Sequence, residues 1–151
     1  MPDLGRDLKV ISGPPGLWAR DGSGLDLLAV NGMPVGHRPD FDLMVTEGRE
    51  NLAQALMLRL LTPVGALAPL GHAAYGCRVT ELIGGLKTAT TRALCKTYVL
   101  AAVAQEPRVD DKAVGFAFDP ASEGPSDLRF TLTVRPRTGE DDVTLDLAVT
   151  L

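Results

Sequence analysis

Three runs of alternating apolar and polar side chains occupy the C-terminal part of the chain. Strict alternation over this length is a strand pattern and does not fit a helix. The turn-rich segments DPASEGPSD and PRTGEDD separate the runs. The sequence therefore predicts a three-stranded antiparallel meander with one dry face. Its apolar members are Val114, Phe116, Phe118, then Leu128, Phe130, Leu132, Val134, then Val143, Leu145, Leu147, Val149 and Leu151.

A first helix is predicted from 49 to 61, because two apolar rows repeat there at every fourth residue. Thr46 is a candidate N-cap for it. Residues 62–76 are rich in Gly and Pro and form a shaped loop. A short helix over 78–84 then ends at a glycine suited to a helix C-terminus. The rows of the first helix are Leu52, Leu56, Leu60 and Ala53, Met57, Leu61.

A second helix is predicted from about 90 to 105. Its apolar residues are spread around the axis, so it should be buried against more than one layer. Pro107 has no N–H and disfavours the α conformation at Glu106, which ends the helix. Helices followed by a sheet indicate an α+β fold, with the helices packed on one face of the meander.

The N-terminal part is less regular. Residues 1–24 are rich in Gly, Pro and Asp and predict an irregular arm. Two short alternating segments follow, at 25–29 and 41–45, and they suggest two strands. We expect 25–151 to form one domain, since 151 residues that are 45% hydrophobic and 23% charged suffice for a single core.

Overall charge excludes some classes of partner. A net charge of −4 and a pI near 5.1 argue against nucleic-acid or anionic-membrane binding driven by charge. The N-terminus lacks the apolar segment of a signal peptide, and no stretch has the roughly 18 apolar residues of a spanning helix. We expect a cytoplasmic protein without membrane insertion.

Few residues could support catalysis. The histidines and cysteines show no zinc-binding spacing, and no glycine pattern for phosphate binding occurs. A dyad of His72 and Cys77 is conceivable, but nothing beside Cys77 marks it as activated, and buried hydrophobic cysteines are the simpler reading. Carboxylates such as Asp110 and Asp111, or Glu140, Asp141 and Asp142, are expected in turns, where solvation explains them. The sequence therefore predicts no enzyme, no metal and no cofactor.

Charged residues are unevenly distributed. Residues 78–108 carry five basic side chains against two acidic ones, whereas 109–151 carry four against nine. Glu106 is unusual, because a carboxylate at a helix C-terminus faces the negative end of the helix dipole. Glu106 and Arg108 could still be ordinary surface residues, and Arg92 could belong to a solvated helix face.

Several motifs in residues 46–112 occur together in a fixed order. They are Leu61-Thr62-Pro63-x-Gly65, Leu70-Gly71-His72-x-x-Tyr75-Gly76-x-Arg78, Glu81-Leu82-Ile83-Gly84, Arg92, and Glu106-Pro107-Arg108. With these motifs the chain resembles the baseplate wedge and sheath-initiator family of contractile injection systems. This family includes phage tail wedge proteins, the TssE proteins of type VI secretion systems, and subunits of extracellular phage-tail-like particles. The form of the second motif is most similar to the extracellular and myophage branch.

The resemblance implies a structural role in assembly. It implies a fold like the C-terminal domain of tail sheath subunits, and about six copies per baseplate. The implied partners are other wedge proteins, the tail sheath subunit, and inner tube or hub proteins. It also implies a particle assembled in the cytoplasm. The residues that we predict to contact partners are Glu106, Pro107, Arg108, Arg78, Arg92, Thr144, Asp146 and Ala148.

The last three of these residues belong to the terminal strand. That strand has no proline and a single charge, so it either lies centrally in the sheet or leaves an open edge to which a sheath strand could add. Two other functions remain as alternatives. One is a lysozyme-like peptidoglycan hydrolase, because members of the family have been given that name. The other is a stand-alone adaptor domain.

Overall fold

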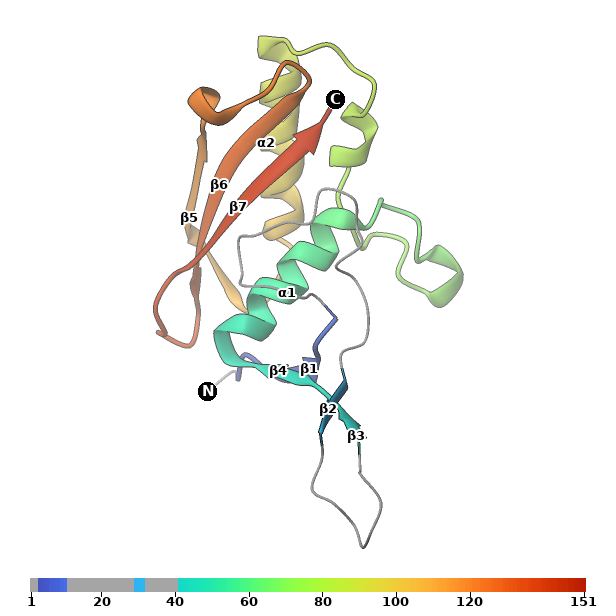
Figure 1. Cartoon of the computed structure of the whole chain (residues 1–151), viewed down its shortest axis with the longest axis vertical. Helices are drawn as coiled ribbons and strands as arrows, with labels where there is room; N and C mark the ends of the chain where they lie inside the picture. Colours follow the sequence, from blue (N-terminus) through green and yellow to red (C-terminus); the bar gives the residue numbers. More distant parts are fainter. Residues whose placement is uncertain (1–2, 11–28, 32–40) are drawn as a thin grey trace, which may run out of the picture.

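The computed structural model describes residues 3–10, 29–31 and 41–151 of the chain. Two helices and a C-terminal three-stranded sheet form the main body, and short strands lie at its N-terminal end (Figure 1). In chain order the elements are β1 (Arg6–Leu8), β2 (Ala29–Asn31), β3 (Phe41–Leu43), β4 (Val45–Glu47), α1 (Gly48–Leu61), the 3₁₀ helices η1 (Ala68–Leu70) and η2 (Val79–Leu82), α2 (Ala89–Val103), β5 (Val109–Phe118), the 3₁₀ helix η3 (Pro120–Ser122), β6 (Asp127–Pro136) and β7 (Val143–Thr150).

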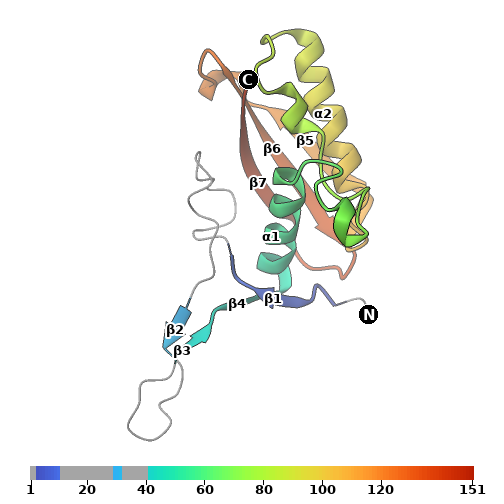
Figure 2. The same cartoon turned by 90° about the vertical axis from the view of Figure 1, so that its right-hand side faces the viewer.

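The C-terminal sheet is the predicted meander. Its strand order is β5-β6-β7, and both pairs are antiparallel. Figure 2 shows α1 and α2 on the same side of this sheet. The α+β fold and the one-sided packing of the helices are therefore confirmed. The sheet order also answers one open question, because β7 lies at an edge and β6 at the centre.

The core is formed between the sheet and the two helices. The four apolar side chains of β6 are at most 3% exposed, and Leu52 and Leu56 of α1 are fully buried. Phe116 stacks on Phe130 of β6, with ring centroids 4.7 Å apart. Burial of these side chains away from water supplies the main stabilisation of the fold. The core residues of β6 are Leu128, Phe130, Leu132 and Val134.

The start of α1 differs from the prediction. Glu47 occupies the N-cap position, and its side chain makes no capping hydrogen bond. Thr46, the predicted cap, lies one residue too early, in β4. Its side chain is 1% exposed, and its hydroxyl has no hydrogen-bond partner among the described residues. The assignment of Thr46 as the cap is wrong, because strand pairing with Asp7 of β1 carries the chain one residue further before the helix begins.

The second helix is also less enclosed than predicted. Cys95, Val99, Ala102 and Val103 form its buried face. The opposite face is exposed, and Leu94 on that face is 38% exposed. Burial against more than one layer is therefore wrong for α2, because the small and polar residues of the outer face leave it in contact with solvent. Its N-terminus is capped by Thr88, whose hydroxyl accepts a hydrogen bond from the Thr91 amide.

The loop over 62–76 is closed at its base. The Cys77 amide donates to the Thr62 carbonyl at 2.8 Å, and Arg59 lies 4.4 Å above the centroid of the Tyr75 ring. Gly76 has φ +120°, and a Cβ at this position would collide with the Thr62 carbonyl oxygen. The predicted short helix follows as η2, and Gly84 after it has the expected left-handed φ of +84°.

Part of the predicted N-terminal arm is regular. Residues 6–8 form β1, which pairs antiparallel with β4, and Leu4 is fully buried in the core. Residues 11–24 lie outside the described residues, as does most of the predicted strand at 25–29. Its last residue begins β2, which pairs with β3. Among the helices of the described residues, none is long and apolar enough to cross a membrane.

Candidate interaction surfaces

The Glu106-Pro107-Arg108 triplet forms an ion pair at the end of α2. Arg108 donates to both carboxylate oxygens of Glu106, with Nε to Oε1 at 2.6 Å and Nη2 to Oε2 at 3.1 Å. Its third nitrogen, Nη1, donates to the carbonyl of Leu4 at 2.9 Å. Because Pro107 restricts the backbone between the two side chains, the arginine fork is held in one orientation.

Glu106 lies inside the protein. Its side chain is 5% exposed, and Nη2 of Arg59 from α1 lies 3.7 Å from Oε2. Burial alone would raise the pKa of Glu106, but the hydrogen bonds and charge of Arg108, together with Arg59, outweigh it and lower the pKa. The carboxylate therefore joins α1, the end of α2 and the N-terminal segment. Neither Arg59 nor Leu4 carried a signal in the sequence that marked it as a partner of this triplet.

The triplet was predicted to contact partner proteins, and the structure gives it a structural role as well. Glu106 is internal, whereas Pro107 is exposed and the Arg108 side chain is 24% exposed. A partner could therefore touch the proline and the outer side of the guanidinium group. It could not reach the carboxylate without displacing Arg108.

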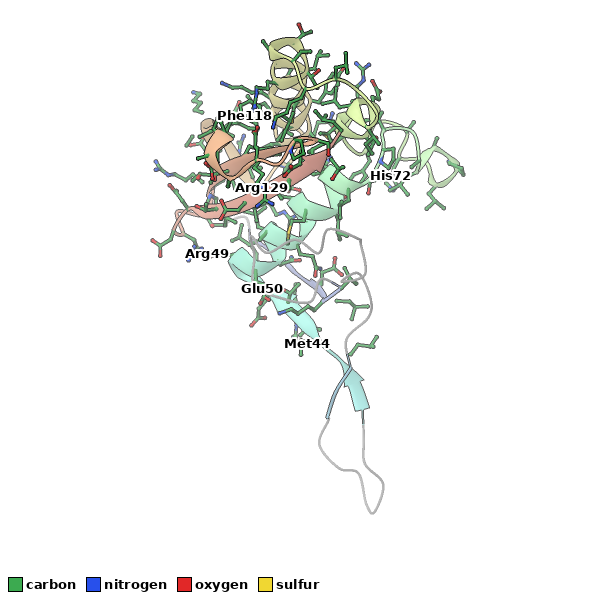
Figure 3. All side chains as sticks on the ribbon, turned by 45° about the horizontal axis from the view of Figure 1, so that its top comes forward. Met44, Arg49, Glu50, His72, Phe118 and Arg129 are labelled. Carbon is green, nitrogen blue, oxygen red and sulfur yellow. The ribbon has the colours of Figure 1, made fainter. Side chains whose placement is uncertain are left out.

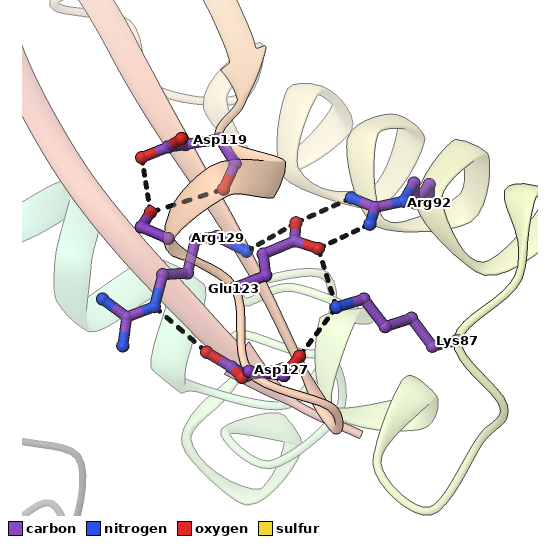
Figure 4. A network of polar contacts seen from close by, with 8 residues as sticks. Lys87, Arg92, Asp119, Glu123, Asp127 and Arg129 are labelled. Carbon is purple, nitrogen blue, oxygen red and sulfur yellow. Dashed lines mark hydrogen bonds and ion pairs between the residues drawn. The ribbon is translucent and has the colours of Figure 1, made fainter.

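Arg92 belongs to a second buried ion pair (Figure 4). Both of its terminal nitrogens donate to Glu123, whose side chain is 1% exposed. Lys87 binds the same carboxylate at 2.8 Å, and the Arg129 amide donates to it at 3.1 Å. The network joins the N-terminal end of α2 to the segment between η3 and β6. Arg92 thus has an internal partner in addition to its predicted external role.

The pKa of Glu123 is lowered to about 2. The hydrogen bonds from Arg92 are the largest cause, and they outweigh the effect of burial; Lys87 and the Arg129 amide lower the pKa further. Sequence analysis missed Glu123 because it lies in a turn-rich segment, where a carboxylate is usually solvated. Arg92, 31 residues earlier, gave no local signal of the pairing.

Arg78 is the most accessible of the predicted arginines. It forms a two-hydrogen-bond pair with Glu81, both bonds at 2.9 Å, and the two side chains are 54% and 51% exposed. Its guanidinium group also lies 4.7 Å from the centroid of the Tyr98 ring. The pair is held in place but remains open to solvent, so Arg78 stays a candidate for partner contact.

Strand β7 leaves one side of its backbone unpaired. The Leu151 amide bonds to the Ser126 carbonyl at 2.7 Å, and hydrogen-bonded pairs alternate along an antiparallel ladder. In the observed register, the odd-numbered residues of β7 therefore bond to β6. The outward N–H and C=O groups belong to the even-numbered residues and have no partner within the part of the chain that the structure describes. These residues are Thr144, Asp146, Ala148 and Thr150.

The opposite edge of the sheet is protected. The pairing of β5 with β6 is irregular between Val109 and Val114, and three charged residues lie in that interval. Irregular pairing and charged side chains both discourage the addition of another strand. Strand β7 has regular pairing along its whole length, no proline, and Asp146 as its single charged residue. The sheet therefore has one edge suited to strand addition.

The candidate catalytic residues do not come together. Cys77 is buried, its thiol donates to the Tyr98 carbonyl at 3.4 Å, and burial raises its pKa. His72 lies on the exposed loop away from the sheet (Figure 3), and no hydrogen bond joins it to Cys77 in the described residues. Cys95 is fully buried, and burial is the main reason that its pKa is raised to about 12. Both cysteines are thus the buried hydrophobic residues that were predicted.

No group of three or more potential metal ligands occurs among the residues that the structure describes. The placement of Asp110 and Asp111 in a turn is wrong, because pairing of Val109 with Pro136 begins strand β5 before them. Asp111 lies 3.7 Å from Arg137, and Asp142, between β6 and β7, pairs with Arg135 at 2.9 Å. His37 lies outside the described residues.

Comparison with known proteins gives one structural relative. No protein-family model and no curated protein matches the chain. A crystal structure of a protein from Geobacter sulfurreducens, provisionally named a tail lysozyme, aligns with a TM-score of 0.58. The two chains share a fold. The alignment has 19% identity and covers 70% of this chain and 93% of the other.

This similarity supports part of the sequence interpretation. It shows that the chain shares its fold with a protein named a tail lysozyme. At this level of identity the likeness concerns the fold alone. The name of the relative describes an enzyme, and that description applies to the relative.

Proposed function

We propose that this chain is a non-enzymatic structural subunit of the baseplate in a contractile, phage-tail-like injection system. In this role it links wedge proteins to the first sheath ring, and a sheath subunit adds a strand to its sheet. The observation that carries the proposal is the edge of β7, which the described residues leave unpaired. The fold shared with a protein named for a tail supports it. Strand addition to an exposed edge is a common way for one protein to recognise another.

The geometry of the two edges supports this assignment. Monomeric proteins usually protect sheet edges with bulges, charges or covering segments. Here β5 has such protection, and β7 has a regular ladder with four residues whose backbone groups point outward. An edge of this kind, which residues 3–10, 29–31 and 41–151 leave unpaired, is suited to a partner strand.

Wedge proteins would dock on the other predicted contact residues. Pro107 and the exposed side of Arg108 lie at the end of α2, and the Arg78–Glu81 pair lies at η2. These groups are oriented by hydrogen bonds within the chain, which lowers the entropic cost of binding. Arg92 would add a contact near the N-terminal end of α2, where its guanidinium group lies 5.2 Å from the centroid of the Phe118 ring.

A peptidoglycan hydrolase is the second candidate, because the structural relative carries that name. A glycosidase of the usual type needs a carboxyl group that stays protonated to act as the acid. The two most enclosed carboxylates of the described residues, Glu106 and Glu123, have lowered pKa values, because arginines bind them. Both are held in the charged form, so neither provides such an acid.

The test of the proposed function is to block the β7 edge. In Ala148→Pro the strand loses an outward N–H and keeps its ladder with β6, because the amides that bond to β6 belong to the odd-numbered residues. Ala148→Ser is the matched control, since it retains the N–H. Asp146→Pro should act in the same way.

We expect particles with the proline variant to have complete baseplates without sheath when examined by electron microscopy. The serine variant should have extended sheaths of normal length. Full-length sheaths on the proline baseplates would refute strand addition at β7. Baseplates that assemble normally without this chain would refute the structural role itself.

A further inference from the structure

The free edge of β7 has an apolar environment on the side that faces the helices. A wide depression runs beside the C-terminal half of β7. Residues from the end of α1 and from η2 line one part of it, and mostly polar residues between 119 and 131 line the other part. Leu61 and Ile83 lie in this lining and are 37% and 65% exposed. Both line the same depression as Leu147, Ala148 and Val149 of β7. Figure 2 shows α1 packed against this side of the sheet.

The other face of the same edge is polar and carries a negative charge. Thr144, Asp146, Ala148 and Thr150 are all exposed there. The Thr131 hydroxyl donates to one oxygen of Asp146 at 2.7 Å. The cations of β6 on this face are bound elsewhere, since Arg129 pairs with Asp127 at 3.0 Å and Arg135 pairs with Asp142 at 2.9 Å.

A second copy of β7 is a poor occupant for this edge. The strand contains no basic residue, so pairing of two copies would bring the Asp146 carboxylates to one face without a cation between them. Like charges placed opposite or near one another on a sheet are destabilising. The edge is therefore suited to a strand from a different protein.

We infer that the β7 edge selects an amphipathic strand with apolar side chains over Leu61 and Ile83 and a lysine or arginine opposite Asp146. The inference rests on the proposed function in taking strand addition as the role of this edge. It adds the chemistry of the partner strand, which the charge of Asp146 and the apolar lining beside β7 determine.

The experiment extends the chain, because β7 ends one residue before Leu151. A Thr-Asn-Gly extension after Leu151 provides a two-residue turn that favours a hairpin. A nine-residue strand follows it, in which Val or Ile at even positions alternates with Thr at odd positions. In the register set by the turn, the seventh residue of this nine-residue strand lies opposite Asp146. The extension is made with Lys, Gln or Glu at this position, and each is also made in an Asp146→Asn chain.

We expect the added strand to protect the amides of Asp146 and Ala148 from hydrogen exchange. The Lys form should melt above the Glu form by about 2–4 °C, with the Gln form between them. In the Asp146→Asn chain this difference should disappear. Serine at the fourth and sixth positions of the nine-residue strand, which face the helices, should lower the melting temperature and the amide protection.

Each part of the inference can be refuted separately. Unprotected amides in every extended chain would show that the edge does not accept a strand of this kind. Equal melting temperatures for the Lys and Glu forms would refute the charge preference, and an unchanged serine variant would refute the apolar contact. The experiment uses the purified chain, so its failure is distinct from a failure of baseplate assembly in the proline variant.

Discussion

Replacing Glu106 by glutamine tests the ion pair at the end of α2. The change keeps the shape of the side chain and removes its charge. It weakens two charge-assisted hydrogen bonds from Arg108, at 2.6 and 3.1 Å, and leaves Arg59 beside a neutral group. Loss of one member of a buried pair costs roughly 3–5 kcal/mol. Since glutamine keeps an acceptor and Arg108 can regain some water, we expect a loss of about 3 kcal/mol.

The matched control is Glu81→Gln. Glu81 also binds an arginine through two hydrogen bonds, at 2.9 Å each, but this pair is about half exposed. For a domain of this size, the Glu106 variant should melt about 6–12 °C below the unmodified chain at pH 7. The Glu81 variant should change by about 1 °C, because exposed pairs contribute little. Thermal unfolding followed by circular dichroism measures both.

The comparison also separates two roles for Glu106. If the residue served assembly alone, its replacement would leave the isolated domain as stable as the Glu81 variant. Equal melting temperatures for the two variants would therefore refute the burial argument. A large loss limited to Glu106→Gln would show that any assembly defect of this variant includes a folding defect.

Three further predictions concern acid stability, the loop and catalysis. The pKa of Glu123 is lowered to about 2 from an ordinary 4.5, so its contribution to stability is complete above pH 4.5 and is lost as the pH falls towards 2. Glu123→Gln should therefore reduce the free energy of unfolding at pH 7. It should also flatten the loss of stability in acid, as measured by equilibrium unfolding at several pH values. Gly76→Ala should reduce the free energy of unfolding by roughly 1–3 kcal/mol or more, because of its φ of +120° and the collision with Thr62, whereas Gly71→Ala, with φ +84° and open space, should cost about 1 kcal/mol. The purified chain should release no soluble fragments from peptidoglycan; turnover abolished by one carboxylate substitution would contradict the structural role.

The sheet and helices were predictable because their signals are local. Alternation in β5, β6 and β7 and the fourth-residue repeats of α1 each reflect the side of an element that is buried. The N-cap of α1 was not predictable in the same way. Pairing of Thr46 with Asp7, far away in the sequence, moved the start of the helix. The strand β1 itself is short and has exposed side chains, so no alternation marked it.

In the candidate site, too, contacts between neighbours in the sequence were predictable and long-range contacts were not. Arg78 and Glu81 are three residues apart, and a motif could indicate their proximity. The partners of Glu106 from α1 and from the N-terminal segment, and the partner of Arg92 after η3, depend on the packing of distant segments. Local sequence marked only Glu106 as unusual, because of its place at a helix C-terminus. It could not show that each carboxylate was enclosed within the chain.

The terminal strand, β7, was predictable from the sequence only in part. Its alternation predicted which side chains are buried, and its lack of proline and its single charge raised two alternatives. The strand order β5-β6-β7 decided between them, and this order depends on which strands pair with the two sides of β6. The assignment of outward backbone groups to Thr144, Asp146 and Ala148 then followed from the register.

The central claim is that β7 accepts a strand from a sheath subunit in an assembled baseplate. Cryo-electron microscopy of extended particles, purified from cells that encode this chain, tests it most directly. The account predicts main-chain hydrogen bonds between a sheath strand and Thr144, Asp146 and Ala148, with a basic side chain beside Asp146. A baseplate in which this chain is present and the β7 edge faces solvent, or one from which the chain is absent, would contradict the account.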